Sequence, residues 1–126
     1  MSVPEVYLGD DKLLDPSWAE VKKRIEQLNG SSSTEVLIGD LDKKQFLIIS
    51  GGNEGRYLGV VQEGKKGFYT LIDPEKPEEL VMVKSGGLDD YYPANRVQSL
   101  QTVLRTAKTY FETSEKDVRF QWKKGQ

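Results

Sequence analysis

The chain has 126 residues, which is the size of a single domain, and we expect one domain over residues 1–126. It contains 18 basic and 20 acidic residues and neither cysteine nor histidine. This composition excludes thiol nucleophiles, Ser-His-Asp systems and the common zinc sites. It also lacks the basic excess that is typical of nucleic-acid-binding proteins.

No apolar run approaches the roughly 20 residues that a membrane-spanning helix needs, so we expect no membrane partner. Residues 1–4 lack the basic start and the apolar centre of a secretory signal peptide. The sequence therefore predicts a cytoplasmic protein.

The first predicted elements are a short strand over residues 5–8 and a helix that begins near Ser17. Two starting points remain open for this helix: Asp15 acts as the N-cap, or Ser17 does so with Glu20 closing a capping box. Apolar residues at helical spacing give it one apolar face. Gly30 then supplies a left-handed stop.

Four extended segments follow one another between Glu35 and Asp73. Connections of roughly 4 to 6 residues join them, which suits hairpins and is too short for helical crossovers. The pattern predicts an antiparallel meander that forms the centre of the fold. The segments are residues 35–38, 45–50, 56–62 and 68–72.

The remainder of the chain predicts elements that flank and cover the meander. We expect a strand over residues 80–83, an exposed loop over 85–93, a helix over 99–113 and a half-buried strand over 118–122. The fold class is therefore α+β, with a mostly antiparallel sheet and two helices packed against it, on one face.

The predicted loop at Leu88–Pro93 places two adjacent tyrosines beside two aspartates. Tyrosine is enriched at binding hot spots because it offers a large, stiff and amphipathic surface, and the neighbouring carboxylates suit a basic partner. In an alternative interpretation, Tyr92 packs on the core and the rest of the segment is solvated. With acidic residues of other predicted turns, the candidate binding set comprises Asp89, Asp90, Tyr91, Tyr92, Asp40, Asp42 and Glu54.

The sequence predicts no catalytic residue, no metal site and no cofactor. The acidic pairs Asp40/Asp42 and Asp89/Asp90 lack the spacing of a dedicated calcium loop. A glycosidase would need two carboxylates about 5 to 10 Å apart in a cleft, and nothing in the sequence positions such a pair.

Four sequence features occur in an informative order. They are a helix opening at residues 16–18, a strand-rich middle, Tyr92–Pro93 ahead of a helix that carries Ala107 and Phe111, and a closing aromatic segment at residues 120–122. From about Asp15 to Trp122, this order resembles the immunity proteins of bacterial polymorphic toxin systems. The resemblance is closest to the first-numbered immunity family, which is found beside toxins with deaminase-type domains.

The resemblance implies an α+β protein marked by a tryptophan and an acidic residue. Trp122 matches the tryptophan, and Glu112, Glu115 and Asp117 are nearby candidates for the acidic residue. It also implies a protein that is not an enzyme, and that inhibits a cognate secreted toxin by covering its active site. We expect a basic, nucleic-acid-directed toxin domain as partner, bound one-to-one by a monomer. The alternative is a small adaptor or secretion chaperone that binds a peptide at a sheet edge.

Overall fold

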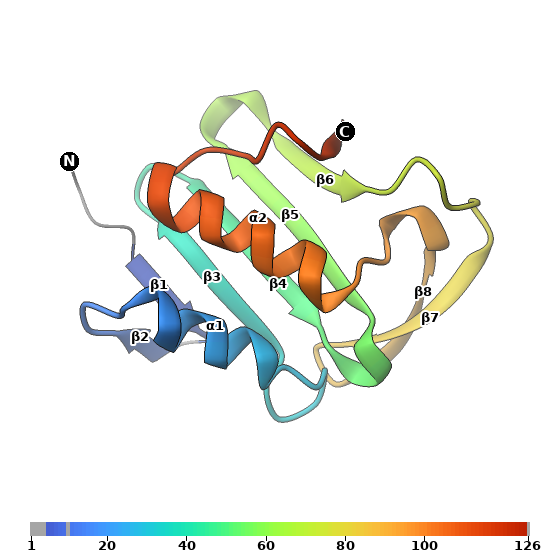
Figure 1. Cartoon of the computed structure of the whole chain (residues 1–126), viewed down its shortest axis with the longest axis horizontal. Helices are drawn as coiled ribbons and strands as arrows, with labels where there is room; N and C mark the ends of the chain where they lie inside the picture. Colours follow the sequence, from blue (N-terminus) through green and yellow to red (C-terminus); the bar gives the residue numbers. More distant parts are fainter. Residues whose placement is uncertain (1–4, 10, 126) are drawn as a thin grey trace.

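The computed structural model describes residues 5–9 and 11–125 of the chain. Residues 1–4, on which the expectation about a signal peptide rests, lie outside this part. The protein is a mostly antiparallel sheet with two α-helices in front of one face and a separate β-hairpin at one end (Figure 1). This arrangement confirms the predicted α+β class. No helix in the described residues is long and apolar enough to cross a membrane.

The large sheet has seven strands in the order β2-β1-β3-β4-β5-β6-β9, and all neighbours run antiparallel. Its centre is the predicted meander, in which each strand pairs with the next one along the chain. Short 3₁₀ turns, η1 (Asn53–Gly55) and η2 (Gly64–Lys66), close two of the hairpins. The strands are β1 (Glu5–Leu8), β2 (Asp11–Leu13), β3 (Glu35–Asp40), β4 (Gln45–Gly51), β5 (Tyr57–Glu63), β6 (Phe68–Ile72) and β9 (Gln121–Lys124).

Helix α1 (Trp18–Glu26) begins at the second of the two predicted starting points, the one with Ser17 as N-cap. The Ser17 side chain accepts a hydrogen bond from the main-chain N–H of Glu20, which satisfies one of the free donors at the helix start. Asp15 instead has a left-handed backbone with a φ of 42°. Ser17 is therefore the N-cap, and Asp15 belongs to the preceding turn.

Helix α2 (Leu100–Thr113) lies across the middle strands, beside α1 (Figure 1). Its N-cap is Ser99, whose side chain accepts from the N–H of Thr102, so the helix begins one residue after the predicted start. Apolar residues of both helices meet the strand residues that point to the same face of the sheet. The fully buried members of this core are Val6, Val21, Ile25, Val36, Ile38, Leu47, Ile49, Val61, Leu71, Val103, Ala107 and Tyr110.

The segment predicted as an exposed loop is a strand, so that expectation was wrong. Strand β7 (Leu80–Ser85) pairs with β8 (Leu88–Pro93) in a two-stranded sheet, and η3 (Ala94–Arg96) follows. Gly86 and Gly87 have φ values of 61° and 81°, which is the left-handed backbone that a two-residue hairpin turn requires. The polar composition of the segment reflects its exposure and not a lack of pairing.

The closing strand is shorter than predicted. The alternation over residues 118–122 predicts that Val118 is buried, yet its side chain is 90% exposed and β9 begins only at Gln121. The physical reason is a turn at Asp117, which redirects the chain before the strand starts. Trp122 lies on the core side of β9 and packs partly buried against the core, as predicted.

Gly30 lies in the loop after α1 and contacts the β7–β8 hairpin. Its φ is 79°, as its predicted left-handed role requires, although α1 already ends at Glu26 with Gln27 as its C-cap. A Cβ at Gly30 would lie 2.3 Å from the main-chain oxygen of Lys84, and the Gly30 oxygen accepts from the N–H of Gly87 at 2.7 Å. The glycine is therefore required for the close approach as well as for the backbone angle.

We expect the substitution Gly30→Ala to lower the free energy of unfolding by about 2 kcal/mol, because it adds a steric clash to the left-handed strain. Urea denaturation measures the effect. Gly55→Ala is the matched control, since Gly55 has a φ of 72° and nothing within 4 Å of an added Cβ. Equal losses in both variants would show that the contact with Lys84 is unimportant.

Candidate functional site

Strand β8 carries the acidic and aromatic candidates on its exposed length. Asp89, Asp90 and Tyr91 are all exposed, and the Tyr91 side chain keeps 63% of its surface accessible. A carboxylate oxygen of Asp90 accepts from the Tyr91 main-chain N–H at 2.8 Å. Pairing with β7 holds these three side chains on an ordered strand, which lowers the entropy lost when a partner binds.

Tyr92 has a different environment from its neighbour. It is partly buried against a small apolar cluster formed by Leu58, Val83 and Val97. Burial raises the pKa of Tyr92, and the charge of Asp90 raises it further. Tyr92 therefore anchors the hairpin to the large sheet, while Tyr91 faces the solvent. We use the name acidic hairpin surface for the exposed trio Asp89, Asp90 and Tyr91.

Glu54 lies near the hairpin, at the turn between β4 and β5. Its carboxylate is 3.5 Å from an Arg56 guanidinium nitrogen, and the same nitrogen donates to the Met82 main-chain oxygen on β7 at 2.9 Å. Arg56 thus connects this turn to the hairpin, and Glu54 lies at the same end of the sheet.

Asp40 and Asp42 lie at the other end of the sheet. Asp40 is the last residue of β3 and Asp42 lies in the turn that leads to β4; the Asp40 carboxylate accepts from the Lys43 main-chain N–H at 3.2 Å. Because β4 runs between this turn and the turn that holds Glu54, the structure separates the two groups of candidates. The seven predicted residues therefore occupy two surfaces.

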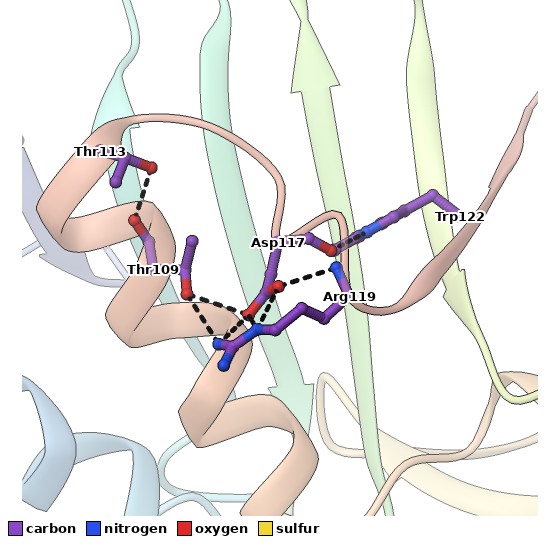
Figure 2. Close-up of polar contacts among 5 residues, drawn as sticks. All are labelled: Thr109, Thr113, Asp117, Arg119 and Trp122. Atoms are coloured by element: carbon purple, nitrogen blue, oxygen red, sulfur yellow. Dashed lines mark hydrogen bonds and ion pairs between the residues drawn. The ribbon is translucent and has the colours of Figure 1, made fainter.

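A cluster of polar contacts at the C-terminal end of the chain joins α2 to β9 (Figure 2). At its centre is Asp117, which is 2% exposed. Its carboxylate accepts from the Thr109 hydroxyl at 2.9 Å, from the Arg119 main-chain N–H at 3.0 Å, and from the Arg119 guanidinium at 2.6 to 3.2 Å. We call this cluster the Asp117 clamp, comprising Thr109, Asp117, Arg119 and Trp122.

Trp122 completes the clamp from β9. Its indole N–H donates to the main-chain oxygen of Asp117 at 3.0 Å, as Figure 2 shows. Among the three acidic candidates, Asp117 contacts this tryptophan through its main chain, whereas Glu112 and Glu115 are exposed. Sequence reasoning did not single out Asp117. The useful signal was an aspartate two residues before an arginine, a spacing that allows an Asx turn closed by an ion pair.

The electrostatics of the clamp fit a structural role. Hydrogen bonds from the Arg119 guanidinium lower the pKa of Asp117 to about 2, with smaller contributions from the Arg119 main chain and Thr109. A carboxylate that is ionised at neutral pH and already accepts several hydrogen bonds is a poor proton acceptor for catalysis. In the described residues, no group of three acidic side chains is placed to hold a metal ion.

The fold and these surfaces define a class of protein: an α+β domain with an exposed, ordered strand that carries acidic and aromatic side chains. The family model of immunity protein Imm1 matches residues 9–124. The chain therefore belongs to the Imm1 immunity protein family, whose members bind a cognate toxin. Neither the curated proteins nor the solved structures contain a match to the chain.

Proposed function

We propose that this immunity protein neutralises a nucleic-acid-directed toxin of the deaminase type, and that it does so by covering the toxin's active site. The observation that carries this proposal is the acidic hairpin surface, because it combines two exposed carboxylates with an exposed tyrosine on an ordered strand. Family membership supplies the inhibitory role.

The charge of the partner follows from its substrate. An enzyme that acts on nucleic acid needs a basic surface around its active site to attract phosphates. Asp89 and Asp90 offer the opposite charge to that surface, which increases association rate and specificity. Tyr91 adds a buried aromatic contact once the complex has formed.

The proposal requires no catalysis by this chain. A one-to-one complex that buries roughly 1,200 to 2,000 Å² blocks access to an active site by itself. The protein would act as a monomer in the cytoplasm of the producing cell, without binding nucleic acid.

Calorimetric titration into the C-terminal domain encoded by the gene immediately upstream tests the proposal, with that domain's activity on nucleic acid measured in parallel. We expect one-to-one binding in the nanomolar range, on the order of −12 kcal/mol, and loss of the activity. An upstream domain that stays active and unbound would contradict the proposal.

A second candidate function is a small adaptor or secretion chaperone that binds an extended peptide at a sheet edge. The supporting observation is that β8 has a partner strand on only one side within the described residues. Its other edge can pair with an added strand. Competition by a short extended peptide, in the absence of a folded toxin domain, would favour this function over the first.

A further inference from the structure

The two helices lie on one face of the large sheet (Figure 1), and the opposite face carries a row of paired side chains. Leu37, for example, lies between Val36 and Ile38, which are buried in the core beneath the helices. Side chains alternate along a strand and directly paired residues share a face, so the strand register defines the row. We call it the outer sheet row, and its members on β1, β3, β4, β5 and β6 are Tyr7, Leu37, Ile48, Val60 and Thr70.

The central strands are apolar on both faces. An antiparallel strand with one solvated face normally alternates apolar and polar residues. In β4, however, residues 46–49 are Phe-Leu-Ile-Ile, and in β5 residues 60 and 61 are both valine. This composition is typical of strands that are covered on both sides, so it indicates a second layer over the outer sheet row.

The middle of this row is partly exposed in the described part of the chain. Leu37, Ile48 and Val60 all keep accessible surface, and the two apolar clusters of the described residues contain none of them. On the next row of the same face, Phe68 is 37% exposed and pairs with Gln62. A contiguous exposed apolar patch of this kind marks an interaction site.

The acidic hairpin surface lies next to the outer sheet row. Leu58 is two residues before Val60 on β5 and therefore points to the same face. It is buried in a cluster with Val83 of the hairpin, and Tyr92 packs against this cluster. The hairpin thus covers one end of this face, and the exposed part of the row begins directly beyond it.

The size of a stable interface requires both surfaces. A tight complex buries about 800 Å² on each partner, over roughly 20 to 30 residues. The acidic hairpin surface contributes only Asp89, Asp90 and Tyr91, and charged residues are depleted at the centre of an interface. Four strand spacings of about 4.8 Å separate β1 from β6, so the outer sheet row is about 19 Å wide. An apolar row of this width suits the centre of an interface, and the charged hairpin suits its rim.

From these observations we infer that the outer sheet row is the apolar centre of the toxin interface, and that the acidic hairpin surface is part of its polar rim. The toxin domain presents an apolar patch to the sheet, next to the basic surface that faces Asp89 and Asp90. The family supplies the occupant, because an immunity protein binds a cognate toxin. This inference rests on the proposed function and adds a surface, and a partner chemistry, that the hairpin alone does not define.

The first test measures the affinity of the triple variant Leu37→Thr, Ile48→Thr, Val60→Thr for the upstream-encoded toxin domain. We expect binding at least about 30-fold weaker than that of the wild-type protein, because the variant replaces the apolar centre by polar side chains. The urea unfolding midpoint should change little, since threonine suits strands and the three replaced side chains lie outside the apolar clusters. The matched control is Leu14→Thr, Leu41→Thr, Val118→Thr, which changes three exposed aliphatic residues outside the row.

The second test uses the wild-type protein, so it does not depend on the folding of a variant. The methyl groups of Leu37, Ile48 and Val60 are observed by nuclear magnetic resonance with a soluble gadolinium chelate as the probe. We expect the chelate to broaden these signals in the free protein and to leave them sharp in the complex. Methyl groups of the buried residues Val36 and Ile38 are the control, because the chelate reaches them in neither state.

Each result has a distinct meaning. If the toxin domain binds but the row variant binds as tightly as the control, or the methyl signals stay broadened in the complex, this inference is overturned and the proposed function stands. If the signals are already sharp in the free protein and sedimentation shows a dimer, a second copy covers the row, which also overturns the inference. If the wild-type protein does not bind the domain at all, the proposed function fails, and this inference fails with it.

Discussion

We expect the triple variant Asp89→Lys, Asp90→Lys, Tyr91→Ala, which changes the acidic hairpin surface, to bind the toxin about 10² to 10³-fold more weakly than the wild-type protein. The lysines reverse the charge that attracts a basic toxin, so the association rate falls most strongly at low salt. Loss of the Tyr91 ring removes an interface anchor and increases the dissociation rate, since truncating such an anchor costs about 2 kcal/mol or more. Stopped-flow kinetics at two salt concentrations separates the two effects.

This variant deliberately keeps Tyr92. Because that ring packs on Leu58, Val83 and Val97, its replacement would loosen the hairpin and confuse folding with binding. The control is Glu26→Lys with Glu112→Lys, which makes the same change in net charge at exposed helical positions. A loss of affinity in the control that matches the loss in the triple variant would show that net charge matters and the hairpin does not.

Asp117→Ala is expected to lower the free energy of unfolding by about 3 kcal/mol at pH 7. The substitution removes the acceptor for the Thr109 hydroxyl and for the Arg119 main chain and guanidinium, and hydrogen bonds to charged groups are the stronger ones. Asp117→Asn keeps the shape but loses the charge, so we expect a smaller loss. Urea denaturation followed by tryptophan fluorescence measures both losses, because the Trp122 indole is hydrogen-bonded to the Asp117 main chain.

The same clamp predicts how stability depends on pH. The folded-state pKa of Asp117 is about 2, below the ordinary value of 3.8, so the carboxylate stabilises the fold above about pH 4. This contribution disappears as the pH falls through 2. It amounts to about 1 to 2 kcal/mol, after allowance for an Arg119 guanidinium that is mostly exposed. The stability difference between wild type and Asp117→Asn should therefore shrink between about pH 5 and pH 2. A constant difference would contradict this role.

Much of the fold follows from local patterns in the sequence. The strands of the meander, the apolar faces of both helices and the Ser17 N-cap depend on residues close together in the chain, so periodicity and capping rules predict them. The strand at Leu88–Pro93, which pairs with β7, was missed for a specific reason. Its residues are exposed and polar, and the signal for pairing lay in the two glycines before it.

The candidate surfaces depend on contacts between distant residues. Tyr91 and Tyr92 are adjacent and chemically identical, yet the register of β8 on β7 exposes the first and packs the second. The side of a strand that meets the core is decided by pairing and layer packing, which composition does not specify. Likewise, Asp117 is buried only because α2 and β9 come together around it.

By itself, the sequence determined that this protein is an α+β domain without thiol or imidazole chemistry. The order of its predicted elements and motifs also indicated a resemblance to an immunity protein family. Residue types and short-range spacing are sufficient for those conclusions. The tertiary structure decided that the acidic candidates divide between two ends of the sheet and that Asp117 is the centre of a buried clamp. These features arise from side chains that are far apart in the chain, and their burial and contacts exist only after the layers have packed.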